Sequence, residues 1–186
     1  MTSVSGDSTT SDNAQAALLR RRAIHVAGHA VIALAWDFKV LYLTIGDPHR
    51  TAPPHFAADW VDARVLVARP ESLYGRSRQA ELFVRIILAG SVSQQLYADD
   101  DACSSNWRVC GHDYELAWST AAHLCNDAQD RRNYLLTTLQ RLRVMMQFRQ
   151  YHDEVLELAS ALEERGELYQ SDIRAILSTL QHDGLG

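Results

Sequence analysis

The stretch around which the fold is organised reads Arg21-Arg22-Ala23-Ile24-His25-Val26-Ala27-Gly28-His29-Ala30-Val31-Ile32-Ala33-Leu34-Ala35-Trp36. Apolar residues recur along it at spacings of three and four, which predicts a helix over residues 13–36. His25 and His29 are four residues apart, so a helix places both imidazoles on one face, within reach of one ion. Gly28 lies inside this helix, where glycine costs about 1 kcal/mol relative to alanine. We therefore expect a neighbouring backbone to pass close to it.

The two histidines have the spacing of the H-E-x-x-H motif, in which both histidines bind zinc and the glutamate is the general base of a metallopeptidase. Val26 occupies the glutamate position. Valine has no lone pair with which to accept a proton from a metal-bound water. The pattern therefore keeps two metal-ligating groups and lacks the catalytic base. Small residues on either side of the histidines favour a buried metal helix.

Size and composition limit the classes of protein to which the chain can belong. It has 186 residues, of which 47% are hydrophobic and 22% are charged, as expected of a globular protein. The net charge of −5 argues against nucleic acid as the main partner. Residues 1–12 are rich in serine and threonine and predict a disordered N-terminal tail, whereas residues 13–186 predict a single domain.

We expect a soluble, cytoplasmic protein with no membrane span. No stretch of the sequence approaches the roughly 20 apolar residues that cross a bilayer, and residues 1–12 lack the features of a signal peptide. The three cysteines, Cys103, Cys110 and Cys125, indicate a reducing compartment rather than a disulfide scaffold. The sequence contains no G-x-x-x-x-G-K-[ST] phosphate loop, so an ATPase of that type is not expected in the chain.

The rest of the pattern predicts a mainly helical α+β fold with a small β hairpin or sheet. Residues 39–45 alternate between two faces and predict a strand, residues 55–61 are compatible with a second, and residues 65–67 are ambiguous. Further helices are expected at residues 77–97, from 112 or 113 to 125, and at 128–150, 153–165 and 172–180. Asn126-Asp127 is expected to provide the N-cap of helix 128–150, Ser171 the N-cap of helix 172–180, and Gly166 a C-cap. Gly90 lies in an apolar stretch of helix 77–97, consistent with two helices in close contact.

A third metal ligand has candidates in Gly111-His112-Asp113-Tyr114-Glu115-Leu116-Ala117. A zinc peptidase needs three protein ligands, and this stretch offers His112, Asp113 and Glu115. The same stretch also fits the start of a helix, with Asp113 as a cap and Glu115 as an acid that the helix dipole favours. The residues alone leave both interpretations open.

Three blocks of the sequence resemble the peptidase domain of the FtsH-type zinc metalloproteases, especially small stand-alone relatives of that domain. Residues 23–31 are similar to the family's A-x-H-E-A-G-H-A-V block except at Val26. Residues 88–96 resemble its L-A-G-x-x-A-E-x-L helix, and residues 111–117 resemble its glycine-then-D-L-x-x-A segment, which supplies the third ligand. Residues 155–177 are similar to the last helices of the family.

The resemblance spans about residues 20–180 and implies a mostly helical, FtsH-type zincin-like peptidase domain with a small sheet beside the metal. It implies zinc held by His25, His29 and Asp113, with Glu115 as the second choice for the third ligand. A polypeptide is the implied substrate or binding partner. The family's peptidase domains are normally fed by a fused AAA ATPase, so a separate ATPase is a further implied partner.

Because Val26 replaces the general base, we expect a metal-binding pseudopeptidase with little or no proteolytic activity, and the question of enzymatic activity stays open. One alternative is an active zinc metalloendopeptidase acting on proteins, with Asp99, Asp100 or Asp101 as a substitute base. The other alternative is a metal-free interaction or structural protein.

Overall fold

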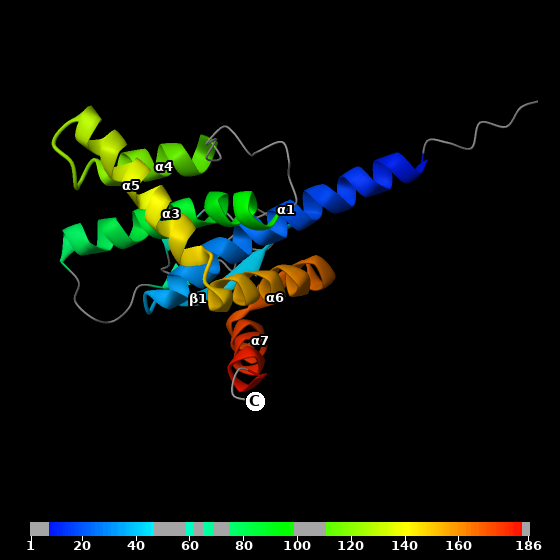
Figure 1. The fold of residues 1–186 in the computed structure, drawn as a ribbon. Coiled ribbons are helices and arrows are strands. Elements are labelled where there is room, and N and C mark those ends of the chain that lie inside the picture. The colour runs from blue at the N-terminus through cyan, green and yellow to red at the C-terminus, as the bar shows by residue number, and fades with distance from the viewer. Residues whose placement is uncertain (1–7, 47–58, 62–64, 69–74, 99–110, 184–186) are drawn as a thin grey trace, which may run out of the picture.

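The computed structural model describes residues 8–46, 59–61, 65–68, 75–98 and 111–183 (Figure 1). In chain order their elements are α1 (Ser8–Ala35), β1 (Lys39–Thr44), β2 (Asp59–Val61), β3 (Val65–Ala68), α3 (Arg76–Tyr97), α4 (Gly111–Ala121), α5 (Ala128–Met146), α6 (Arg149–Arg165), β4 (Glu167–Tyr169) and α7 (Gln170–Asp183). The expected α+β class, mainly helical with a small antiparallel sheet, is confirmed. Among the described residues, no helix is long and apolar enough to cross a membrane.

The helices α1 and α3 pack against each other at the centre of the fold, and α6 covers another side of α1. Residues 23–33 of α1 are all buried. A Cβ added at Gly28 would lie 1.9 Å from the Oγ of Ser93 and 2.9 Å from the carbonyl oxygen of Ala89. Because Ala89 contributes backbone to this contact, the expected close approach of a neighbouring backbone at Gly28 is confirmed.

The four strands pair in the order β2-β3-β1-β4, and each neighbouring pair is antiparallel. The ambiguous stretch at residues 65–67 is the start of β3, which lies between β2 and β1. Residues 59–61 of the expected second strand form β2, and residues 55–58 lie outside the described residues. The sequence did not predict β4, which pairs with β1 through Leu168 opposite Leu43.

Helix boundaries differ most from the expectation in three places. Residues 8–12 of the expected tail are helical, and no proline or glycine interrupts the chain between Ser8 and Ala27. Residues 1–7 of the expected tail lie outside the described residues. This first part of α1 extends away from the rest of the molecule (Figure 1), and residues 12–20 are exposed. The helix expected at 128–150 is divided, because the backbone at Phe148 is extended. The helix expected to end at residue 125 ends at Ala121.

Two of the three expected helix caps are confirmed, whereas Ser171 lies inside α7, which begins at Gln170. The side chain of Asp127 accepts a hydrogen bond of 2.8 Å from the backbone nitrogen of Asp130, in the first turn of α5. Gly166 ends α6 with a φ of 76°, in the left-handed region that favours glycine, and its nitrogen donates to the carbonyl of Leu162. This cap turns the chain directly into β4 and so places the last strand on the sheet.

Candidate metal centre

Three buried side chains meet where α1, α3 and α4 pack together. His25 and His29 come from α1 and Asp113 from the first turn of α4, and their exposed fractions are 6%, 0% and 1%. One ligand atom from each lies within 4.8 Å of the other two. The Nε2 atoms of the histidines are 3.1 Å apart. Oxygens of Asp113 lie 3.5 Å from Nε2 of His25 and 4.0 Å from Nε2 of His29.

The carbonyl oxygen of Ile86 on α3 determines how the ring of His29 is protonated. It lies 2.7 Å from Nδ1 of His29. A carbonyl oxygen can only accept, so Nδ1 carries the hydrogen. In a neutral imidazole the lone pair is then on Nε2, the atom that faces His25 and Asp113. A hydrogen bond from the second ring nitrogen to a carbonyl is the usual support of a metal-binding histidine.

Asp113 is oriented by Ser91, again from α3. The hydroxyl of Ser91 donates a buried hydrogen bond of 2.6 Å to Oδ2 of Asp113. The carboxylate therefore points into the interior toward the two histidines. A buried carboxylate is costly unless a cation or a proton compensates its charge. This placement favours the ligand interpretation of Asp113 over the capping one.

Gly90 on α3 leaves the space beside the ring nitrogens open. A Cβ at this position would lie 2.4 Å from Nε2 of His29 and 2.9 Å from Cε1 of His25. Those distances are far shorter than any van der Waals contact, so every other residue would displace the rings. The two histidines thus depend on a glycine in the neighbouring helix.

The residues present fit a metal ion. A tetrahedral zinc ion with metal–nitrogen bonds of about 2.0–2.1 Å holds neighbouring ligand atoms about 3.3 Å apart. The two histidine nitrogens, 3.1 Å apart, are close to that separation. The nearest oxygens of Asp113 are two different atoms, Oδ2 at 3.5 Å from His25 and Oδ1 at 4.0 Å from His29, and a single oxygen completes a set of three atoms within 4.8 Å of one another. Two imidazoles and one carboxylate are also a ligand set that zinc and other transition metals accept. The buried triad could therefore hold a metal ion.

Among the described residues, no other residue that the sequence suggested for the metal site or for catalysis belongs to the buried triad. Glu115, the second choice for the third ligand, is exposed, and so is His112. Val26 is fully buried in the hydrophobic core, and α-helical geometry places it about 60° around the helix from His29. The suggested substitute bases, residues 99–101, lie outside the described residues.

Sequence reasoning missed the supporting residues from α3. Gly90 was expected at a helix contact, but not beside the imidazoles. The hydroxyl of Ser91 and the carbonyl of Ile86 carry no sequence signal of their own, since any helix presents carbonyls and buried serines are common. Their roles follow only from the crossing of α3 over α1.

Neither the family models nor the curated protein sequences with which the chain was compared give a match.

Proposed function

We propose that the protein is a zinc-binding pseudopeptidase: an FtsH-like domain that holds one zinc ion through His25, His29 and Asp113 and cleaves polypeptides poorly or not at all. The observation that carries the proposal is the buried triad itself, in which two imidazoles and a carboxylate converge. The proposal also rests on Val26, which occupies the position of the general base in an H-E-x-x-H peptidase.

The choice of zinc rests on the donor set and on the resemblance to the FtsH-type peptidases. Imidazole nitrogens also suit copper, iron and nickel, so the donor atoms alone do not select one metal. Three protein ligands leave a fourth position for water or another group, which is the pattern of catalytic zinc sites. The support that His29 receives from Ile86 and Asp113 from Ser91 is of the kind that raises metal affinity.

The chain's own residues explain why the proposed site would bind zinc without cleaving polypeptides efficiently. Zinc, when bound, supplies a Lewis acid that polarises a carbonyl and lowers the pKa of a bound water. Ile86 and Ser91 hold two of the proposed ligands in place. At position 26 an aliphatic side chain cannot take up or deliver a proton, and general acid–base help is worth about 10²–10⁴ in rate. A polypeptide at this site would be retained rather than cleaved.

Metal content of the purified protein tests the binding half of the proposal. We expect about one zinc per chain in the wild-type protein and none in His25→Gln, because glutamine removes a ring nitrogen at similar size. His123→Gln is the matched control, since His123 is exposed and outside the triad. A wild-type protein that takes up no zinc from a zinc buffer would support the metal-free alternative instead.

Cleavage of an unfolded substrate tests the catalytic half. We expect no chelator-sensitive hydrolysis of casein by the wild-type protein and a gain in Val26→Glu. Val26→Gln is the control, because it adds polarity and volume at the same buried position without a base. A wild-type protein that cleaves casein robustly, and loses this activity with His25→Gln, would be an active metallopeptidase and would refute the proposal. Circular dichroism must show that each variant is folded, since position 26 is fully buried.

A further inference from the structure

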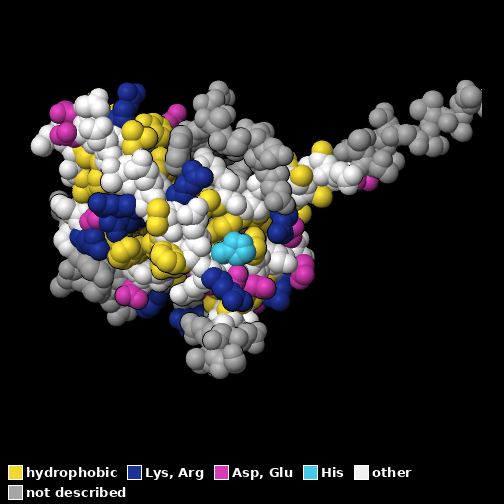
Figure 2. Space-filling view, viewed as in Figure 1, with side chains coloured by type: hydrophobic (Ala, Val, Ile, Leu, Met, Phe, Trp, Pro, Cys, Tyr) yellow, Lys and Arg dark blue, Asp and Glu magenta, His cyan; other side chains and the backbone are white. Residues whose placement is uncertain are grey.

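Helix α5 and the start of α6 carry a concentration of positive charge in an acidic protein. Between Arg131 and Arg149 the chain contains five arginines and no acidic residue, although its net charge is −5. Four of these arginines are exposed, Arg132, Arg141, Arg143 and Arg149, and the last forms an ion pair with Asp153. Figure 2 shows basic side chains beside hydrophobic ones on the face of the molecule that carries α5. A positively charged surface of this kind favours a negatively charged partner.

The same face exposes large apolar side chains. Leu136, Val144 and Phe148 have exposed fractions of 48%, 61% and 63%. Leu136, Gln140 and Val144 follow a spacing of four residues, so they form one stripe along α5. Phe148 lies just beyond the end of this stripe, at the N-cap of α6. The opposite face of α5 packs into the core of the domain through its buried residues Leu135, Thr138, Leu139, Leu142 and Met146. The stripe is therefore not needed for packing within the described part of the chain.

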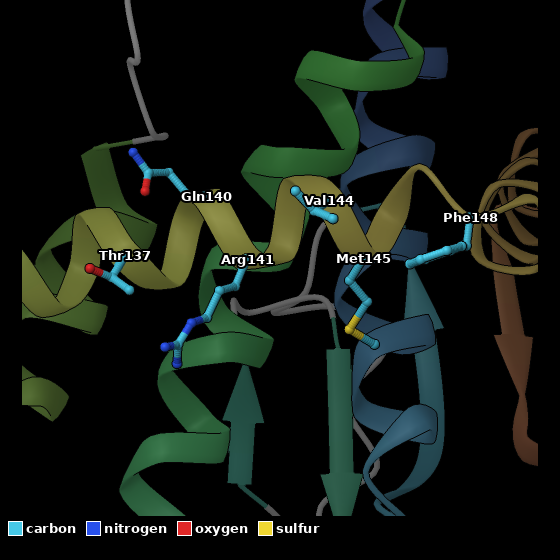
Figure 3. A pocket seen from close by; sticks show the side chains of 6 residues that line it. All are labelled: Thr137, Gln140, Arg141, Val144, Met145 and Phe148. Carbon is cyan, nitrogen blue, oxygen red and sulfur yellow. The ribbon is translucent and has the colours of Figure 1, made fainter.

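A pocket of about 390 Å³ opens beside this stripe. It is lined by Thr137, Gln140, Arg141, Val144, Met145 and Phe148. Figure 3 shows that the lining comes from α5 and from the turn that follows it, with Arg141 and Met145 projecting to the same side of the helix. Arg141 forms no ion pair with any residue that the structure describes. An apolar hollow with a guanidinium at its edge suits an apolar side chain that has a carboxylate nearby.

We propose that this α5 face, defined by Arg132, Leu136, Gln140, Arg141, Val144 and Phe148, docks an acidic segment of another protein whose apolar side chains enter the pocket. Charge complementarity selects the acidic partner, and the concave apolar lining selects side chains rather than phosphates. Nucleic acid is disfavoured because the centre of the face is apolar and the protein as a whole is acidic. A lipid surface is disfavoured because it cannot fill a hollow as a protruding side chain does. The proposal does not rest on the metal centre, whose ligands are outside the pocket.

Selection from a displayed library of random twelve-residue peptides on the full-length protein tests the proposal. We expect enriched peptides to combine a net negative charge with at least one of Phe, Leu, Met or Trp. Binding of a resynthesised peptide, followed by fluorescence polarisation, should weaken about 3–10-fold in Arg141→Gln and more than 5-fold in Phe148→Ala. It should also weaken as salt is raised, because exposed charges are screened.

Matched controls come from exposed residues elsewhere on the molecule. Arg174→Gln on α7 and Leu18→Ala on α1 alter an exposed arginine and an exposed leucine away from the α5 face, and both should leave the affinity unchanged. Failure to enrich acidic, apolar peptides, or equal binding by wild type and Arg141→Gln, would overturn the proposal. Sedimentation with phosphatidylserine vesicles that depends on Arg141 and Phe148, without peptide binding, would overturn it in favour of a membrane surface.

Discussion

At Gly90, α3 passes so close to the two histidines that an added Cβ would overlap the ring of His29. Alanine at this position would improve the intrinsic helix propensity by about 1 kcal/mol. That gain is outweighed locally, because a Cβ 2.4 Å from Nε2 requires the ring or the helix to move. The residue is thus better explained by the space that the two imidazoles need than by the stability of α3.

Gly90→Ala should therefore lower zinc affinity by at least 10-fold, because displaced rings no longer converge with Asp113 on one point. Zinc titration against a competing chelator dye measures this. Gly75→Ala, at the N-cap of the same helix, is the control, since a Cβ there meets no heavy atom within 4 Å. Unchanged affinity in Gly90→Ala would show that the ion does not sit between these side chains.

At the scale of elements, one hydrogen bond joins the ends of two helices. Tyr97 is the last residue of α3, and its hydroxyl donates to the carbonyl of Met146, the last residue of α5. Burial raises the pKa of Tyr97 to about 12. A tyrosine in the unfolded chain has a pKa near 10. Its contribution to stability is therefore fully present below about pH 10 and is lost as the pH rises toward 12.

Tyr97→Phe should lower the free energy of unfolding by about 0.5–1.5 kcal/mol at pH 8, because the hydrogen bond to Met146 is lost. Between pH 10 and pH 12 the variant should lose stability less steeply than the wild-type protein, since the titrating phenol is gone. Urea unfolding at a series of pH values measures both effects. Tyr114→Phe, on an exposed ring of α4, should change neither. Parallel pH profiles for Tyr97→Phe and the wild-type protein would contradict the assignment.

At the scale of the whole molecule, the triad joins parts of the chain that are far apart in sequence. His25 and His29 lie on the central helix, whereas Asp113 follows the two strands β2 and β3 and the long helix α3. A metal ion at this point would connect α1 with α4 across the core. Because the unfolded chain does not present the three side chains together, an ion bound there would stabilise the folded state by mass action.

Zinc at 100 times its dissociation constant should raise the free energy of unfolding by about 2.7 kcal/mol. For a domain of this size the expected rise in melting temperature is about 5–10 °C. Differential scanning calorimetry with zinc or with a chelator measures it. Asp113→Asn, which keeps the shape and can still accept from Ser91, should abolish the zinc-dependent shift. An equal shift in this variant would place the ion elsewhere.

Local signals in the sequence were sufficient to locate the helices and two of their caps, but not all of the helix boundaries. The apolar spacing along residues 13–36 predicted α1, and the sequence around Asp127 and Gly166 predicted one start and one end. Three-residue strands such as β4 carry too little pattern to be recognised, because they exist only through pairing with a neighbour. The N-terminal extension of α1 was missed because serine and threonine were interpreted as disorder.

By itself the sequence determined the two histidines on one helical face and the missing base beside them, because a spacing of four residues and the identity of Val26 do not depend on the rest of the chain. Only the tertiary structure decided that Asp113, and not Glu115, faces those histidines. It also decided that Gly90 and Ser91 surround them. These contacts arise from the packing of α1, α3 and α4, and helix packing depends on shape complementarity between segments remote in sequence.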